Sequence, residues 1–108
     1  MTMVKEMTPA QFKVRAETGR EPILLDVREA WELAIARVDE AVHIPMGEVP
    51  ARLAELERDR DIVVLCRSGG RSAQVAGFLE QQGFETVWNL TGGILAWSDQ
   101  VDSSIPHY

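Results

Sequence analysis

Short apolar runs alternate with helix-like patterns along the chain. The run Asp61–Leu65 is the clearest strand, because its apolar residues are continuous, mostly β-branched and bounded by charge, as in the centre of a parallel sheet. Three further strands are expected over residues 23–27, 41–44 and 86–89. Strands that alternate with helical segments are typical of an α/β domain, and we therefore expect that fold class.

Helical segments occupy the stretches between these runs. Thr8 and Gln11 form a capping box, with Pro9 at the first helical position, so a helix is expected to begin there and to end near Gly19. The other helices are expected over residues 29–36, 50–57, 71–82 and 94–101. The helix over 71–82 has a core-facing stripe made of Ser72, Val75, Ala76 and Leu79.

Composition and charge limit the classes of protein to which the chain can belong. A length of 108 residues predicts a single domain over residues 1–108, and 45% apolar with 26% charged residues is ordinary for a soluble protein. The net charge of −6 argues against a nucleic-acid partner. No apolar run approaches the roughly 20 residues of a membrane helix, and Met1 to Glu6 lacks the apolar core of a secretory signal. We therefore expect a cytoplasmic protein with no membrane partner.

Cys66 is the only cysteine, which excludes an intrachain disulfide and a four-cysteine zinc site. A lone cysteine after an apolar strand is usually a small buried hydrophobic residue. Flanking arginines do not suit that interpretation, because their burial is costly. The residues that follow Cys66 are Arg67, Ser68, Gly69, Gly70, Arg71 and Ser72.

The loop after Cys66 has the composition of an anion-binding site. Gly69 and Gly70 allow the backbone to curl so that successive N–H groups point inward, and the following helix adds the positive end of its dipole. Arg67 and Arg71 add two positive charges. Such surroundings favour the thiolate over the thiol, so we interpret Cys66 as a nucleophile.

The spacing of the loop restricts its chemistry. Cysteine phosphatases use a Cys-x5-Arg loop, which encloses the oxygens of a phosphate group, whereas four residues separate Cys66 from Arg71 here. A tighter loop fits a smaller group, such as one extra sulfur atom on the cysteine. The spacing therefore favours sulfur chemistry over a phosphatase or an arsenate reductase.

The sequence resembles the single-domain rhodaneses, the thiosulfate sulfurtransferases. Residues 66–72 are similar to the family's active-site loop, residues 25–29 to its Asp-Val-Arg box, and residues 90–97 to its closing Gly-Gly-aromatic motif. Residues 36–41 are a degenerate form of another family box, and residues 101–108 resemble tails of rhodanese domains fused to sulfur-carrier-activating enzymes. The resemblance implies a rhodanese-like domain with a mostly parallel central sheet of about five strands, flanked by helices on both faces.

The resemblance also implies a two-step sulfur transfer. Cys66 would take the outer sulfur of thiosulfate and pass it to cyanide or to a thiol acceptor such as thioredoxin, glutathione or a sulfur-carrier protein. Arg67 and Arg71 would bind the sulfonate group, because the planar guanidinium donates two hydrogen bonds to oxyanions. Ser68 and Ser72 would donate hydroxyl hydrogen bonds to the persulfide or the substrate. No metal or organic cofactor is expected.

Two alternatives use the same loop. The chain could be a sulfur relay module that receives persulfide from a partner protein without turnover of a small donor. It could also be a catalytically silent domain used only for binding, which an intact Cys66 makes the weaker hypothesis.

Several residues outside the loop have structural interpretations. Asp26 and Arg28 flank Val27 at a strand end and are expected to form an ion pair or loop cap near the site. His43 alternates with apolar neighbours and is expected on a polar strand face. Packing in the core or at its rim is expected for Trp31, Trp88 and Trp97.

Overall fold

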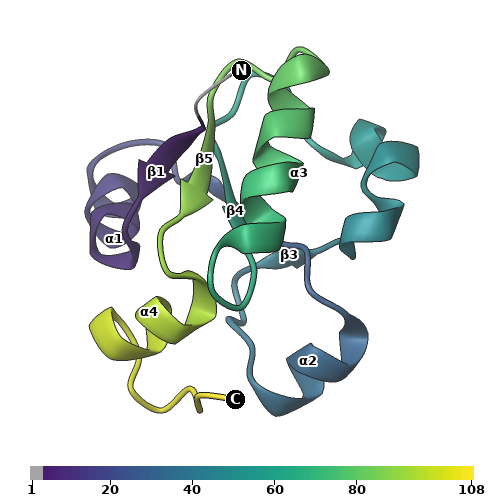
Figure 1. Cartoon of the computed structure of the whole chain (residues 1–108). Helices are drawn as coiled ribbons and strands as arrows, with labels where there is room; N and C mark the ends of the chain where they lie inside the picture. The colour runs from purple at the N-terminus through teal and green to yellow at the C-terminus, as the bar shows by residue number, and fades with distance from the viewer. Residues whose placement is uncertain (1–3) are drawn as a thin grey trace.

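The computed structural model describes residues 4–108, so Met1 to Met3 of the expected domain lie outside the described residues. Five parallel strands form one sheet in the order β1-β5-β4-β2-β3 (Figure 1). The strands are β1 Lys5–Met7, β2 Ile23–Asp26, β3 Val42–His43, β4 Ile62–Leu65 and β5 Val87–Leu90. The expected parallel sheet of about five strands is therefore confirmed.

Strand β1 was not among the strands expected from the sequence. It has three residues, of which only Met7 is buried, and it pairs with β5 at the edge of the sheet. A short and mostly polar segment carries no recognisable strand pattern. It becomes a strand because β5 offers it a parallel partner, in the register Glu6 with Asn89.

Residues 4–108 also form four α-helices and two 3₁₀ helices, and all of these except the last helix lie between successive strands. The α-helices are α1 Pro9–Thr18, α2 Ala30–Ile35, α3 Gly70–Gln81 and α4 Gly93–Gln100. The 3₁₀ helices are η1 Met46–Glu48 and η2 Pro50–Glu55. The expected helix over 50–57 is therefore wrong in type and length, because the backbone of Arg52 (φ −119°, ψ 21°) leaves the helical region. Among residues 4–108, no helix is both long and apolar enough to cross a lipid bilayer.

Alternate residues of β4 face two separate cores. Ile62 and Val64 pack under α3 together with Val75 and Leu79, and Cys66 continues this side of the strand. The opposite side packs against α1 and α4 and includes Val63, Leu65, Phe12 and Trp97. The helices thus cover both faces of the sheet, as Figure 1 shows. Because all strands are parallel, the segments that follow β2, β4 and β5 meet at one edge, where open α/β sheets place their sites.

Candidate active site

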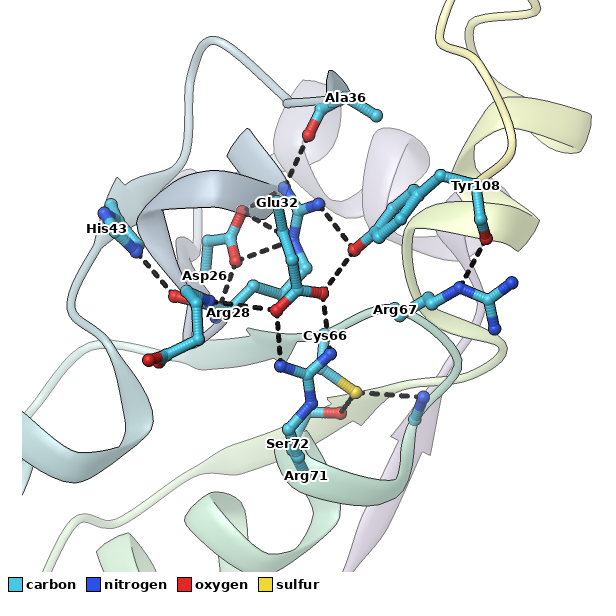
Figure 2. A network of polar contacts seen from close by, with 12 residues as sticks. Asp26, Arg28, Glu32, Ala36, His43, Cys66, Arg67, Arg71, Ser72 and Tyr108 are labelled. Carbon is cyan, nitrogen blue, oxygen red and sulfur yellow. Dashed lines mark hydrogen bonds and ion pairs between the residues drawn. The ribbon is translucent and has the colours of Figure 1, made fainter. Parts of the chain in front are cut away.

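The turn from β4 into α3 wraps around the sulfur of Cys66. Cys66 is buried, and Gly69 adopts a left-handed backbone conformation (φ +118°) that residues with a side chain rarely adopt. This turn brings the Gly69 N–H to 3.0 Å from Sγ. The Ser72 hydroxyl donates to Sγ at 3.2 Å from the first turn of α3. Figure 2 shows the sulfur of Cys66 beside the Ser72 hydroxyl.

Two opposing effects act on the pKa of the Cys66 thiol. Burial raises the pKa because it disfavours the charged form. Hydrogen bonds from the Ser72 side chain and from the backbone N–H groups of Ser72, Gly69 and Ser68 lower it, and together they outweigh burial. The net effect is a lowered pKa, so the hydrogen bonds of the loop increase the fraction of Cys66 that is thiolate.

The turn between β5 and α4 lies against this loop and donates hydrogen bonds to its backbone. Gly92 and Gly93 both have positive φ, and the first N–H groups of α4 donate to the loop backbone. The Ile94 N–H reaches the Cys66 carbonyl oxygen at 2.9 Å, and the Leu95 N–H reaches the Arg67 carbonyl oxygen at 3.3 Å. A Cβ on Gly93 would lie 2.5 Å from the Cys66 carbonyl oxygen, so only glycine allows this approach.

The two arginines of the loop bind groups within the chain. Arg71 donates from both terminal nitrogens to Glu32, at 2.6 and 2.8 Å, and Glu32 is only 3% exposed. Arg67 donates from Nε to the carbonyl oxygen of Tyr108 at 2.5 Å. The Arg71 side chain is 37% exposed, so it can still face solvent beside the loop. Glu32 thus holds the guanidinium in place next to Cys66.

A buried polar network extends from Glu32 to β2. The Tyr108 hydroxyl donates to Glu32 at 2.6 Å and accepts from Arg28 at 2.9 Å, while Arg28 pairs with Asp26 at 2.8 Å (Figure 2). His43 Nε2 donates to the Arg28 carbonyl oxygen at 2.7 Å. Burial lowers the pKa of Arg28, but the hydrogen bonds that Arg28 donates to Asp26 and Tyr108 raise it above the usual value overall.

Glu32 has a strongly shifted pKa. The hydrogen bonds from Arg71 lower it, burial opposes this, and the hydrogen bonds from Tyr108 and the Glu29 backbone lower it further, to about 2. Sequence reasoning missed both Glu32 and Tyr108. Glu32 had a local signal, because it stands three residues after Glu29 and caps α2. Tyr108 had none, since it lies 76 residues from Glu32 along the chain.

The three tryptophans that were expected to pack in the core or at its rim differ in burial. Trp97 is buried against Phe12 at 5.5 Å between ring centroids, and Trp88 is half-buried. Trp31 is 62% exposed and packs edge-on against Tyr108, so it belongs to the rim. Within residues 4–108, no group of three or more His, Cys, Asp or Glu side chains is arranged to hold a metal ion.

Comparison with known proteins identifies the family. The model of the rhodanese-like domain matches residues 8–100. The chain is 42% identical to YtwF of Bacillus subtilis over 90% of its length and 93% of that protein, and 40% identical to a sulfurtransferase of Allochromatium vinosum over 89% and 90%. A rhodanese-like domain protein from Staphylococcus aureus superimposes with a TM-score of 0.82 at 28% identity, over 97% of this chain and 99% of the other. The chain therefore belongs to the rhodanese-like family, which includes sulfurtransferases.

Proposed function

We propose that the chain is a sulfurtransferase that moves a sulfane sulfur from thiosulfate, or a similar donor, through a persulfide on Cys66 to a thiol or cyanide. The observation that supports this most directly is the pair of hydrogen-bond donors at Sγ, the Gly69 N–H and the Ser72 hydroxyl. Donors that stabilise a thiolate also stabilise a persulfide anion held in the same loop. A compartment that keeps thiols reduced, such as the cytoplasm, suits this chemistry.

The proposed reaction is two successive displacements at sulfur. In the first, the Cys66 thiolate attacks the outer sulfur of thiosulfate, the sulfur–sulfur bond breaks, and sulfite leaves with the bonding electron pair. In the second, an acceptor thiolate or cyanide attacks the outer sulfur of the persulfide, and Cys66 leaves as thiolate. The electrons balance without a metal or cofactor. Ping-pong kinetics are expected because the enzyme carries the sulfur between the two steps.

The loop residues have separate proposed roles. Ser68, Gly69 and Gly70 shape the backbone that faces the sulfur. The hydrogen bonds of Ser72 lower the thiol pKa most, and the N–H groups of Gly69 and Ser68 lower it further. Arg71 is held beside the loop by Glu32 and would present its charge to the anionic donor. Arg67 would assist from the other side, where Tyr108 orients it. Asp26 and Arg28 support Glu32 through Tyr108.

The test is sulfite release and thiocyanate formation from thiosulfate and cyanide. The wild-type protein is expected to catalyse both, and a Cys66→Ser variant neither, because the hydroxyl is far less ionised than the thiol. Mass spectrometry after incubation with thiosulfate alone should show one added sulfur atom on Cys66. If Cys66 gains sulfur only from a persulfide-bearing protein and never from thiosulfate, the chain is a relay. Turnover of an aryl phosphate would instead support a phosphatase.

Replacement of Arg71 by alanine is expected to reduce kcat/KM for thiosulfate about tenfold, because a charge-assisted hydrogen-bond donor to the donor's sulfonate is lost. The thiol pKa should also rise, which alkylation rates measured across pH will show. Arg20→Ala is the matched control, since Arg20 is exposed and pairs with Glu57 away from the loop. An unchanged kcat/KM and an unchanged alkylation profile in Arg71→Ala would rule out an electrostatic role for this residue.

A further inference from the structure

A chain of hydrogen bonds joins Glu6 on β1 to the sulfur of Cys66. The Glu6 carboxylate accepts from Asn89 Nδ2, at 3.1 Å to Oε2 and 3.3 Å to Oε1. The Ser72 hydroxyl lies within hydrogen-bond distance of two acceptors, Asn89 Oδ1 and, at 3.2 Å, Cys66 Sγ. This chain links β1, β5 and α3 to the reactive atom, and it uses none of the residues that hold Arg71.

The orientation of the Asn89 amide is fixed by its neighbours. One Nδ2 hydrogen is directed at Glu6 and the other at the Gly69 carbonyl oxygen, at 3.2 Å. Both neighbours are acceptors, so a flipped amide would place Oδ1 against a carboxylate and a carbonyl. Oδ1 must therefore face Ser72, where it accepts a hydrogen bond.

The Ser72 hydroxyl has one proton and two acceptors. When Cys66 is a thiol, its S–H can donate to Ser72 Oγ, and Ser72 can donate to Asn89, so all three groups are satisfied. When Cys66 is a thiolate, the Ser72 proton must turn to the sulfur, and Asn89 Oδ1 loses its donor. Asn89 thus competes with the sulfur anion for a single proton, inside a buried site where an unmet acceptor is costly.

Glu6 strengthens this competition. A carboxylate that accepts from Nδ2 polarises the amide and makes Oδ1 a better acceptor, because hydrogen bonds in a chain reinforce one another. We propose that Glu6 and Asn89 are positioning residues that direct the Ser72 proton and so set the fraction of Cys66 present as thiolate. The loop N–H groups favour the thiolate, whereas Glu6 and Asn89 favour the thiol and so keep a fraction of the molecules with Cys66 protonated.

This arrangement matters for the proposed function. When the negative charge moves from Sγ to the outer sulfur of a persulfide, Sγ becomes a poor acceptor. The Ser72 hydroxyl can then return to Asn89 instead of remaining without a partner. The proposal itself concerns the thiol, so it can be tested whether or not the chain transfers sulfur.

The other charged groups near Cys66 stay constant in the test. They are Arg71 on α3, Arg67 in the loop and Glu32 on α2, together with the titratable Tyr108 hydroxyl. Within residues 4–108, no hydrogen bond joins any of them to Glu6 or Asn89. Thr91 donates to Glu6 at 2.9 Å and is also left unchanged. A change at Glu6 therefore reaches the thiol by one of two routes, through Asn89 and Ser72 or directly through space.

The first experiment measures alkylation of Cys66 by iodoacetamide as a function of pH. Glu6→Gln keeps an acceptor for Asn89 but removes the charge, and it is expected to increase the thiolate fraction below the thiol pKa about threefold. Glu17→Gln removes the same charge from the exposed side of α1 and should leave the profile unchanged. An unchanged or lowered thiolate fraction in Glu6→Gln would overturn the proposal.

A double-mutant cycle separates the two routes. In a Ser72→Ala background the chain of hydrogen bonds is broken, so adding Glu6→Gln should no longer shift the alkylation profile. A shift as large as that in the wild-type background would show a direct electrostatic effect and would overturn the proposal. Alanine is smaller than serine and favours a helix, so this background is expected to fold.

The infrared S–H stretching band gives a second readout that leaves Ser72 intact. At about pH 6 the protonated thiol is expected to donate to Ser72 Oγ, and that hydrogen bond lowers the band frequency. In Glu6→Gln the hydrogen bond should weaken, and the band should move to higher frequency. A band at the wild-type frequency would contradict the proposal.

Discussion

Replacement of Gly93 by alanine is expected to destabilise the fold by about 3 kcal/mol or more and to abolish sulfur transfer. Gly93 has φ +61°, a conformation that costs a residue with a side chain about 1–2 kcal/mol. The added Cβ would also press on backbone atoms of Cys66 and Arg67, at 2.5 Å from the Cys66 carbonyl oxygen. Backbone cannot move aside like a flexible side chain, so the loop itself must shift.

The same change should disturb the site as well as the stability. The hydrogen bonds from Ile94 and Leu95 to the loop carbonyls depend on the close approach of α4 at Gly93. If that approach is lost, the Gly69 N–H is no longer held on Sγ, and the thiol pKa should rise toward its usual value. The expected readouts are denaturant unfolding and the pH profile of alkylation.

Gly77→Ala is the matched control for this prediction. Gly77 lies inside α3, and among residues 4–108 a Cβ there would meet only Val4, at an ordinary contact distance of 3.8 Å. Because alanine favours the helix, this variant is expected to be as stable as the wild type or about 0.5–1 kcal/mol more stable. Equal stability of Gly93→Ala and Gly77→Ala would show that α4 does not support the loop in the way described.

The strands of this fold could be predicted where their burial is continuous. Strand β4 is buried on both faces, so its sequence is an uninterrupted apolar run, and its prediction was correct to within one residue. Strand β1 has one buried residue and depends on its partner β5, which no local pattern can indicate. The segment after Pro50 has helical spacing, but its backbone leaves the helical region at Arg52 and it forms a 3₁₀ helix.

The residues of the site also fall into a local set, which the sequence predicts, and a distant set, which it does not. The loop from Cys66 to Ser72 is local, so composition and spacing were enough to bring its residues together in a prediction. The groups that hold the loop come from distant parts of the chain. They are Glu32 on α2, Asn89 on β5 and Tyr108, the last residue described. Asn89 carried a weak signal, as a polar residue in an apolar strand. Its partners became visible only in three dimensions.

The buried carboxylate of Glu32 should make the protein sensitive to acid. Its pKa is about 2 in the folded protein, well below the usual 4.5, because Arg71 and Tyr108 donate to the charged form. A lowered folded-state pKa means that the unfolded chain binds the proton more readily. The stabilisation is therefore fully present above about pH 4.5 and is lost as the pH falls toward 2, with a total of about 3 kcal/mol.

Glu32→Gln is the direct test of this acid sensitivity. The variant is expected to lose about 2–4 kcal/mol at neutral pH, because the buried contact with Arg71 is weakened, and to lack the part of the acid transition due to Glu32. Urea unfolding from pH 7 to pH 2 should therefore give two stability curves that converge as the pH falls. Parallel curves would show that Glu32 is not the titrating group.

Glu55→Gln provides the control for exposure. Glu55 also pairs with an arginine, Arg52, but its carboxylate side chain is 50% exposed, whereas that of Glu32 is 3% exposed. An exposed pair is screened by water and salt, so this variant should follow the wild-type curve at every pH. The contrast between the two variants isolates burial as the cause of the effect. It follows that the group that orients Arg71 beside the thiol is also a group whose protonation destabilises the protein at low pH.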